Sequence, residues 1–136
     1  MKIVVGYSDS PGGRAALEAA VDEAKTRQGE LVLFRHVHIT EQGEDRTAAL
    51  NAAREDLDKR VEDLSGQGIS ATAETAISLQ SAASALVGHA DQVGADRIVI
   101  AVRRRSRVGK LVLGSDAQNI LLSANCPVLA VKPAGE

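Results

Sequence analysis

Short, largely apolar runs alternate along this chain with longer segments in which apolar residues recur at helical spacing. The runs are residues 2–7 (KIVVGY), 31–39 (LVLFRHVHI), 69–77 (ISATAETAI), 97–102 (RIVIAV) and 128–131 (VLAV). Strands that are apolar on both faces belong to parallel sheets covered on both sides. Strict alternation of strand and helix requires right-handed crossovers, so the sequence predicts an α/β fold of three layers, with an open parallel five-stranded sheet between helices.

Four helices are expected between the strands, because apolar residues recur there at a spacing of three and four. The first begins at Ser10, a hydroxyl N-cap in front of a proline, and is closed by Gly29. The third is capped by Ser78 or by Ser81. The last begins at Ser115, which opens a capping box and is expected to cap this helix.

Composition narrows the classes of partner. A length of 136 residues fits one domain, residues 1–136, and an apolar content of 44% can fill its core. The aromatic residues are Tyr7 and Phe34, too few for the stacking platforms of single-strand nucleic-acid binders. A formal net charge of -2 gives no global attraction to DNA or to anionic membranes. We therefore expect neither nucleic acid nor membrane as a partner, and a cytoplasmic location.

The strand ends are the expected place for a ligand. In open parallel sheets, ligands bind outside the carboxyl ends of the strands, where the strand order reverses. If the first and fourth strands are central neighbours, this rule selects residues 8–13 and 102–114. The second loop contains Arg103, Arg104, Arg105 and Arg107. Guanidinium groups bind phosphate in a bidentate way, although a short charge cluster is usually no more than a solvated loop.

Catalytic and metal-binding patterns are weak in this sequence. His36 and His38 lie two residues apart on one face of a strand, but no third ligand stands at a telling spacing, so a structural role is expected. His89 falls within a helix, and no serine, histidine and aspartate arrangement is evident. Cys126 precedes a proline and is expected to pack as a small apolar residue. No catalytic residue and no metal site are predicted.

The chain resembles the universal stress protein family in segments spread over its whole length. They are IVVGYSDSPGGRAAL, FRHVH, DRIVIAVRRRSRVGKLVLGSDAQNIL and CPVLAVKP. The resemblance implies a Rossmann-like fold of the kind shared with adenine nucleotide alpha hydrolases, with strand order 3-2-1-4-5. It also implies a homodimer that pairs through the strand at Val128–Val131 and, in one branch of the family, an ATP site.

The ATP-binding branch carries glycine, two residues, glycine, nine residues, then glycine with serine or threonine. In this sequence Ala101 and Arg104 occupy the first two glycine positions, whereas Gly114 and Ser115 keep the last pair. Glycine there lets backbone N–H groups approach phosphate, and the long side chain of Arg104 opposes such an approach. Asp116 also departs from the family, which usually has an apolar residue at this position.

These observations predict an altered site for ATP, another adenine nucleotide or a different phosphate-bearing anion. A helix N-terminus after Gly114 favours an anion, although a cap would explain Ser115 equally well. The family's strand-ending aspartate falls on Ser8, with Asp9 one residue later. The resemblance assigns cofactor binding to the following residues: Ser8, Asp9, Val37, Ala101, Arg103, Arg104, Gly114 and Ser115.

Three functions are compatible with this pattern. The first is a non-enzymatic, homodimeric binding and signalling protein of the stress response, which the lack of catalytic motifs favours. The second is an ATP-binding switch with slow ATPase activity. The third, a relative of electron-transfer subunits or adenosine-phosphate hydrolases, rests on fold analogy alone.

Overall fold

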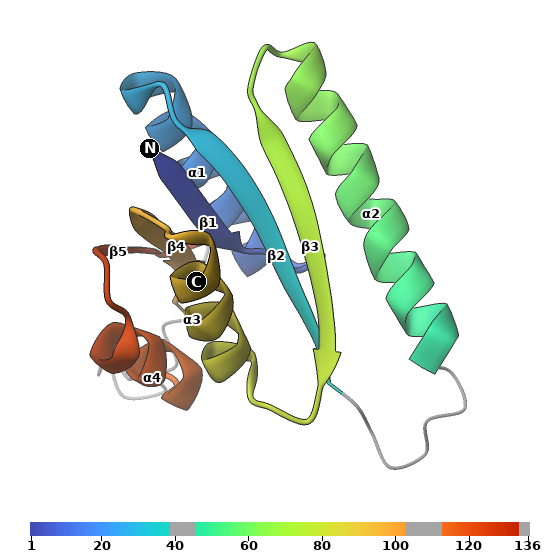
Figure 1. Ribbon diagram of the computed structural model, residues 1–136, viewed down its shortest axis with the longest axis vertical. Coiled ribbons are helices and arrows are strands. Elements are labelled where there is room, and N and C mark those ends of the chain that lie inside the picture. Colours follow the sequence, from blue (N-terminus) through green and yellow to red (C-terminus); the bar gives the residue numbers. More distant parts are fainter. Residues whose placement is uncertain (39–45, 103–112, 134–136) are drawn as a thin grey trace.

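The computed structural model describes residues 1–38, 46–102 and 113–133, in which strands and helices alternate (Figure 1). The strands are β1 (Lys2–Gly6), β2 (Glu30–His38), β3 (Ala71–Ser78), β4 (Arg97–Ala101) and β5 (Val128–Val131). The helices are α1 (Pro11–Arg27), α2 (Arg46–Gly66), α3 (Ala82–Val93) and α4 (Ser115–Ser123). None of the helices in these three ranges is both long enough and apolar enough to cross a membrane.

The five strands form one parallel sheet in the order β3-β2-β1-β4-β5. Val4 of β1 pairs with Val32 on one side and with Ile98 on the other. The predicted fold class and strand order are therefore confirmed. Because β1 and β4 are central neighbours, the strand order reverses between them, as the ligand rule requires.

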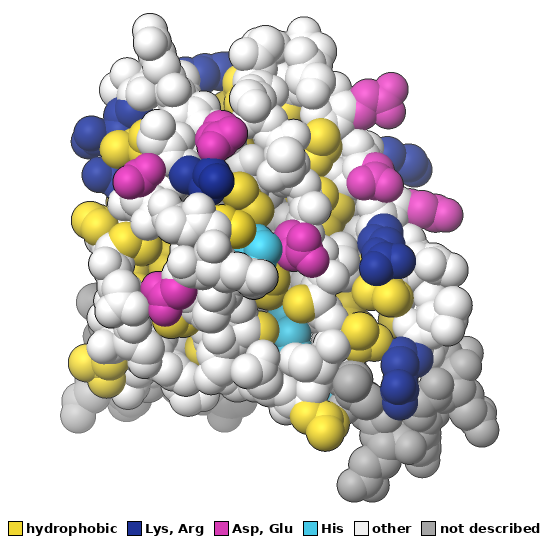
Figure 2. Space-filling view, in the orientation of Figure 1, with side chains coloured by type: hydrophobic (Ala, Val, Ile, Leu, Met, Phe, Trp, Pro, Cys, Tyr) yellow, Lys and Arg dark blue, Asp and Glu magenta, His cyan; other side chains and the backbone are white. Residues whose placement is uncertain are grey.

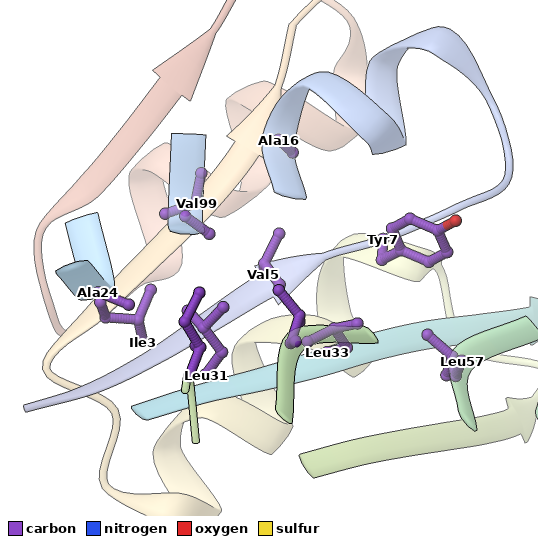
Figure 3. Packing of buried hydrophobic residues seen from close by; sticks show 12 residues of the cluster. Ile3, Val5, Tyr7, Ala16, Ala24, Leu31, Leu33, Leu57 and Val99 are labelled. Atoms are coloured by element: carbon purple, nitrogen blue, oxygen red, sulfur yellow. The ribbon is translucent and has the colours of Figure 1, made fainter. Parts of the chain in front are cut away.

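Successive residues of the central strands pack alternately into two separate hydrophobic cores, one on each face of the sheet. Val5 points toward α1 and α2, and Figure 3 shows it among Ile3, Leu33 and Leu57. Its neighbour Val4 belongs to the core under α3 and α4. Burying one such aliphatic side chain contributes about 1.5–3 kcal/mol, so the two-sided apolar pattern of the strands fixes which face each helix covers.

Helix ends agree with the sequence in part. Ser10 caps α1, and its side chain accepts a hydrogen bond from the Gly13 amide. The left-handed C-cap of α1 is Gln28 rather than the predicted Gly29. Gly29 follows in a tight place, where a Cβ would lie 3.1 Å from the carbonyl oxygen of Met1. The close approach of the chain start therefore explains the glycine.

The N-caps of α3 and α4 decide between Ser78 and Ser81 and correct the prediction for Ser115. Ser81 caps α3 by accepting a hydrogen bond from the Ser84 amide, whereas Ser78 ends β3. The last helix starts at Ser115 as predicted, but its N-cap is Gly114, which makes no side-chain capping bond. The prediction of Ser115 as a cap was wrong by one position, because its backbone is already helical.

Candidate functional site

A cleft of about 310 Å³ opens where β1, β2 and β4 end. Its floor is apolar and includes Phe34 of β2, Leu86 of α3 and Ile100 of β4. All three side chains are buried in the core that α3 and α4 cover. The cleft lies at the reversal of strand order, where parallel sheets of this kind bind their ligands.

Three helices begin at the rim of this cleft. Gly12 and Gly13 belong to the first turn of α1, Ala82 and Ala83 to that of α3, and Ala117 to that of α4. The first amides of a helix lack intrahelical acceptors, and the helix dipole adds partial positive charge there. The backbone around the cleft therefore favours a bound anion.

The α1 side of the rim is closely packed. The hydroxyl groups of Ser8 and Ser10 lie 2.7 Å apart, and the Ser10 hydroxyl also accepts from the Gly13 amide at 3.1 Å. A Cβ on Gly12 would stand 3.3 Å from the Cβ of Ala101 at the end of β4. The first turn of α1 thus rests on the ends of both central strands.

His36 brings a titratable ring into the cleft wall. Its Nε2 atom lies 2.8 Å from the Ser78 hydroxyl, and its ring centre lies 6.2 Å from that of His38. Burial lowers the pKa of His36 below the usual 6.5, and His38 adds to this, whereas Ser78 and the charge of Asp116 oppose it. Near pH 7 the ring is therefore mostly uncharged.

Figure 2 shows histidine side chains reaching the surface between α3 and β3, with hydrophobic side chains around them. Among residues 1–38, 46–102 and 113–133, no group of three or more His, Cys, Asp and Glu side chains could hold a metal ion. The structural role expected for His36 describes only part of its position. The contact with Ser78 is structural, but the ring is also part of the candidate site.

Tyr7 closes the cleft on the side of α2. Its ring is only 3% exposed, and its hydroxyl accepts a hydrogen bond from Arg60 Nε at 3.1 Å. Arg60 also pairs with Asp56 at 3.5 Å. Burial raises the pKa of Tyr7, although the bond from Arg60 acts in the opposite direction. The end of β1 is thus fixed to α2 by a neutral phenol.

The structure brings some of the predicted site residues together. Ser8 and Ala101 line the cleft. Asp9 is exposed and pairs with Arg14 at 2.9 Å. Val37 is half-buried in β2 and does not line the cleft, because side chains alternate along a strand and its neighbour His36 does.

The remaining predicted residues stand in the sequence between the end of β4 and the first turn of α4. Gly114 and Ser115 are exposed at the start of this helix, and Asp116 after them lines the cleft. Arg103 and Arg104 lie outside the described residues. Tyr7 and His36 line the cleft but were not among the residues predicted from the sequence. Their signal was available, since each stands near the carboxyl end of a predicted inner strand.

Known proteins resemble this chain along nearly its whole length. The universal stress protein family matches residues 1–132. The chain belongs to this family. A universal stress protein from Mycolicibacterium smegmatis is 37% identical over 133 residues, which are 98% of this chain and 98% of that protein. The resemblance seen in the sequence is therefore confirmed.

Solved universal stress proteins share the fold. One from Archaeoglobus fulgidus has a TM-score of 0.77 and 30% identity, over 97% of this chain and 98% of that chain. Another structure, of the universal stress protein from Archaeoglobus fulgidus in complex with dAMP, has a TM-score of 0.70 and 24% identity, over 97% and 98% of the two chains. The Rossmann-like fold of this universal stress protein is thus shared with solved members.

In this member of the family, Ala101 stands at a position where the ATP-binding branch carries glycine, and its methyl group changes the packing beside α1. The Ala101 methyl faces Gly12 across the gap between β4 and α1, so its carbon fills space beside the first turn of α1. Crowding is avoided because Gly12 carries no side chain. The ligand-binding roles of Ser8, Asp9 and Val37, and of the motif residues, remain predictions.

Proposed function

We propose that this single-domain universal stress protein is a non-enzymatic, homodimeric binding and signalling protein of a cytoplasmic stress response. Its ligand is an adenine nucleotide or another small phosphate-bearing anion, held in the cleft between β1 and β4. The observation that carries this proposal is the meeting of three helix N-termini at one apolar-floored cleft. Helix amides suit a phosphate, and the apolar floor suits a flat base.

The volume of the cleft and the similarity to a solved relative both support this ligand class. The cleft volume of about 310 Å³ lies at the lower end of the roughly 300–1,000 Å³ typical of small-molecule sites. A nucleoside monophosphate is a better match for it than a longer ligand. A universal stress protein from Archaeoglobus fulgidus that has the same overall fold was solved in complex with dAMP.

Ligand-dependent thermal unfolding tests the proposal. A ligand that binds only the folded state adds about 2.7 kcal/mol to the free energy of unfolding at one hundred times its Kd. We expect AMP to raise Tm at millimolar concentration and ribose to leave it unchanged. If adenosine, AMP, ADP and ATP all leave Tm unchanged, the proposed function is wrong.

A slow ATPase is the second candidate, and the contact between His36 and Ser78 favours it. A histidine in a cleft can take a proton from a water or a hydroxyl. Among the hydrogen bonds of the described residues, however, no carboxylate orients the His36 ring. Phosphate release from ATP that disappears in His36→Gln, with nucleotide binding retained, would identify the ATPase. No release above the rate in buffer supports the binding protein.

The homodimer that we propose forms along the side of β5 that pairs with no other described strand. This strand lies at the edge of the sheet, with β4 as its neighbour. Its sequence VLAV carries no charge or proline that would discourage pairing with another strand. The exposed Ala130 and the half-buried Leu129 show that the edge is partly apolar. Antiparallel pairing with a second copy would satisfy the edge around a twofold axis.

A further inference from the structure

The strand β3 forms the edge of the sheet opposite to β5, and its outer side pairs with no other strand of the described residues. It is eight residues long, with the sequence ATAETAIS, and its register against β2 runs without a break. Natural sheets protect their edges with proline, lysine, bulges or very short strands. β3 has none of these devices, so its edge is suited to pairing with another extended segment.

The pairing with β2 fixes which backbone groups of β3 point outward. The Leu31 amide donates a hydrogen bond of 2.9 Å to the Ser70 carbonyl, so the backbone of Ser70 faces β2. Backbone groups alternate between the two sides of a strand, and the even-numbered residues of β3 therefore also face β2. The outward-facing N–H and C=O groups belong to the odd-numbered residues Ala71, Ala73, Thr75 and Ile77.

A notch of about 270 Å³ opens on this outer side, between β3 and α2. It is lined by Ala73, Glu74 and Thr75 of β3 and by Arg54, Leu57 and Asp58 of α2. Ala73 and Thr75 are residues whose backbone groups point outward, so the middle of the edge is accessible. Arg54 and Asp58 are exposed above it and offer one positive and one negative group to polar side chains.

The two faces of the edge favour different side chains in a partner strand. Ala73 packs in the core with Leu57, so alternation places the Glu74 side chain on the face away from α2. Glu74 is exposed and has no ion pair among the described residues, whereas Lys2 on that face is paired with Glu30 at 3.7 Å. A basic side chain opposite Glu74 would therefore be favoured, because opposite charges stabilise cross-strand pairs.

A second copy of this chain does not fit the same edge. Two β3 strands around a twofold axis would lie about 4.8 Å apart, with both α2 helices on one face of the sheet. α2 packs over β3 through Leu57 and Leu64, and Figure 1 shows it along the outer side of this strand. The two helices would then be closer than the roughly 8–10 Å that packed helices require. An extended segment without a helix meets no such obstacle.

We propose that the outer edge of β3 binds an extended segment of another protein by strand addition. The segment carries a lysine or arginine opposite Glu74 and small polar side chains toward α2. Outward backbone groups supply the affinity of such pairing, and alternate side chains supply its specificity. This inference is independent of the nucleotide cleft, and pairing through β5 would leave the β3 edges at the two outer margins of the dimer.

Titration of the isotope-labelled full chain with the capped peptide TSVSKSVST, followed through amide resonances, tests the proposal. The serines of this peptide alternate with the central lysine, so they face α2 when the lysine lies opposite Glu74. The same peptide with a central glutamate is the charge control. Thr75→Pro removes an outward N–H without removing a bond to β2, because proline is tolerated at sheet edges, whereas Thr75→Val keeps that N–H.

We expect the lysine peptide to shift the amide resonances of Ala73 and Thr75 and to bind about fivefold more tightly than the glutamate peptide. Glu74→Lys should reverse this preference. Glu18→Lys is the matched control, because Glu18 is exposed on α1, and it should keep the preference of the wild type. Thr75→Val should bind the lysine peptide, and Thr75→Pro should not.

Circular dichroism and Tm establish which variants are folded, and the charge reversal at Glu74 decides the question if Thr75→Pro does not fold. The proposal is overturned if millimolar lysine peptide leaves the β3 resonances unchanged, or if Glu74→Lys keeps the preference for lysine. Equal binding by the wild type and a folded Thr75→Pro also excludes this edge. If Thr75→Pro dissociates an oligomer seen by light scattering, a second copy occupies the edge and the proposal is wrong.

Discussion

The backbone of Gly13 lies so close to Ser8 that a Cβ on Gly13 would stand 1.9 Å from the Ser8 carbonyl oxygen. The Ser8 amide nitrogen would be only 2.5 Å away. Real Cβ atoms do not approach backbone atoms so closely, and the backbone cannot rotate aside as a side chain can. The first turn of α1 therefore sits directly on the turn that leaves β1, and this contact shapes one wall of the cleft.

Replacing Gly13 by alanine should be strongly destabilising. The added methyl group forces α1 away from the β1 turn, and overpacking of this kind costs about 1–3 kcal/mol or more. Gly88→Ala is the matched control, since Gly88 lies within α3 with nothing within 4 Å of its added Cβ. That control should gain up to about 1 kcal/mol from helix propensity. Equal urea midpoints for the two variants would contradict the close contact.

The stability of the protein should depend on pH through His36. Its pKa is lowered in the folded state, so on acidification the unfolded chain takes up the proton first. The contribution of the neutral ring is complete above about pH 6.5, the usual histidine value, and is lost as the pH falls toward the folded pKa. His36→Gln should flatten the change in free energy of unfolding over this window.

His38→Gln provides the comparison for that experiment, because His38 is exposed at the end of β2. We expect it to keep most of the pH dependence seen in the wild type. Urea unfolding at several pH values between neutral and mildly acidic measures both variants. Identical slopes for His36→Gln and the wild type would show that His36 does not carry the effect.

Tyr7→Phe should lower the free energy of unfolding without changing the affinity for a nucleotide. The substitution keeps the ring in the cleft wall and removes the hydroxyl that accepts from Arg60 Nε at 3.1 Å. We expect the free energy of unfolding to fall by about 1 kcal/mol, the usual value of one such bond. AMP affinity should change little, because the hydroxyl is engaged with α2. A large loss of affinity with unchanged stability would mean that the hydroxyl contacts the ligand.

Ala130→Lys should convert the proposed dimer into monomers. Ala130 is exposed on the edge strand β5, whereas Leu129 packs against the core and would perturb folding if changed. Two lysines brought together across a twofold axis repel each other, as edge lysines do in natural sheets. Light scattering measures the mass, with Ala52→Lys on the exposed face of α2 as control. A dimer that survives Ala130→Lys would exclude this interface.

The alternation of strands and helices, together with the family resemblance, was enough to predict the fold. The apolar pattern of β1 and β4 requires cover on both faces, which leaves few arrangements open. Local rules were less reliable where tertiary contacts compete with them. Gly29 was expected to cap α1, but the nearby Met1 carbonyl decides that position and Gln28 takes the left-handed conformation.

The site was harder to predict than the fold. His36 and Val37 are neighbours in sequence, and only the alternation of β2, fixed by its register against β1 and β3, decides which of them faces the cleft. The pairing of His36 with Ser78 joins residues 42 positions apart, which no local pattern reports. Asp116 was visible as an unusual residue, but its place on the rim needed the orientation of α4.

The rim of the cleft is assembled from the beginnings of helices that are distant from one another along the polypeptide. The ligand that we propose would bridge α1, near the start of the chain, and α4, near its end. Occupancy would then slow hydrogen exchange of amides in α1 and α4 together, although no covalent connection between those helices changes. The rigidity of α1 and α4 would then depend on the concentration of the ligand in the cell.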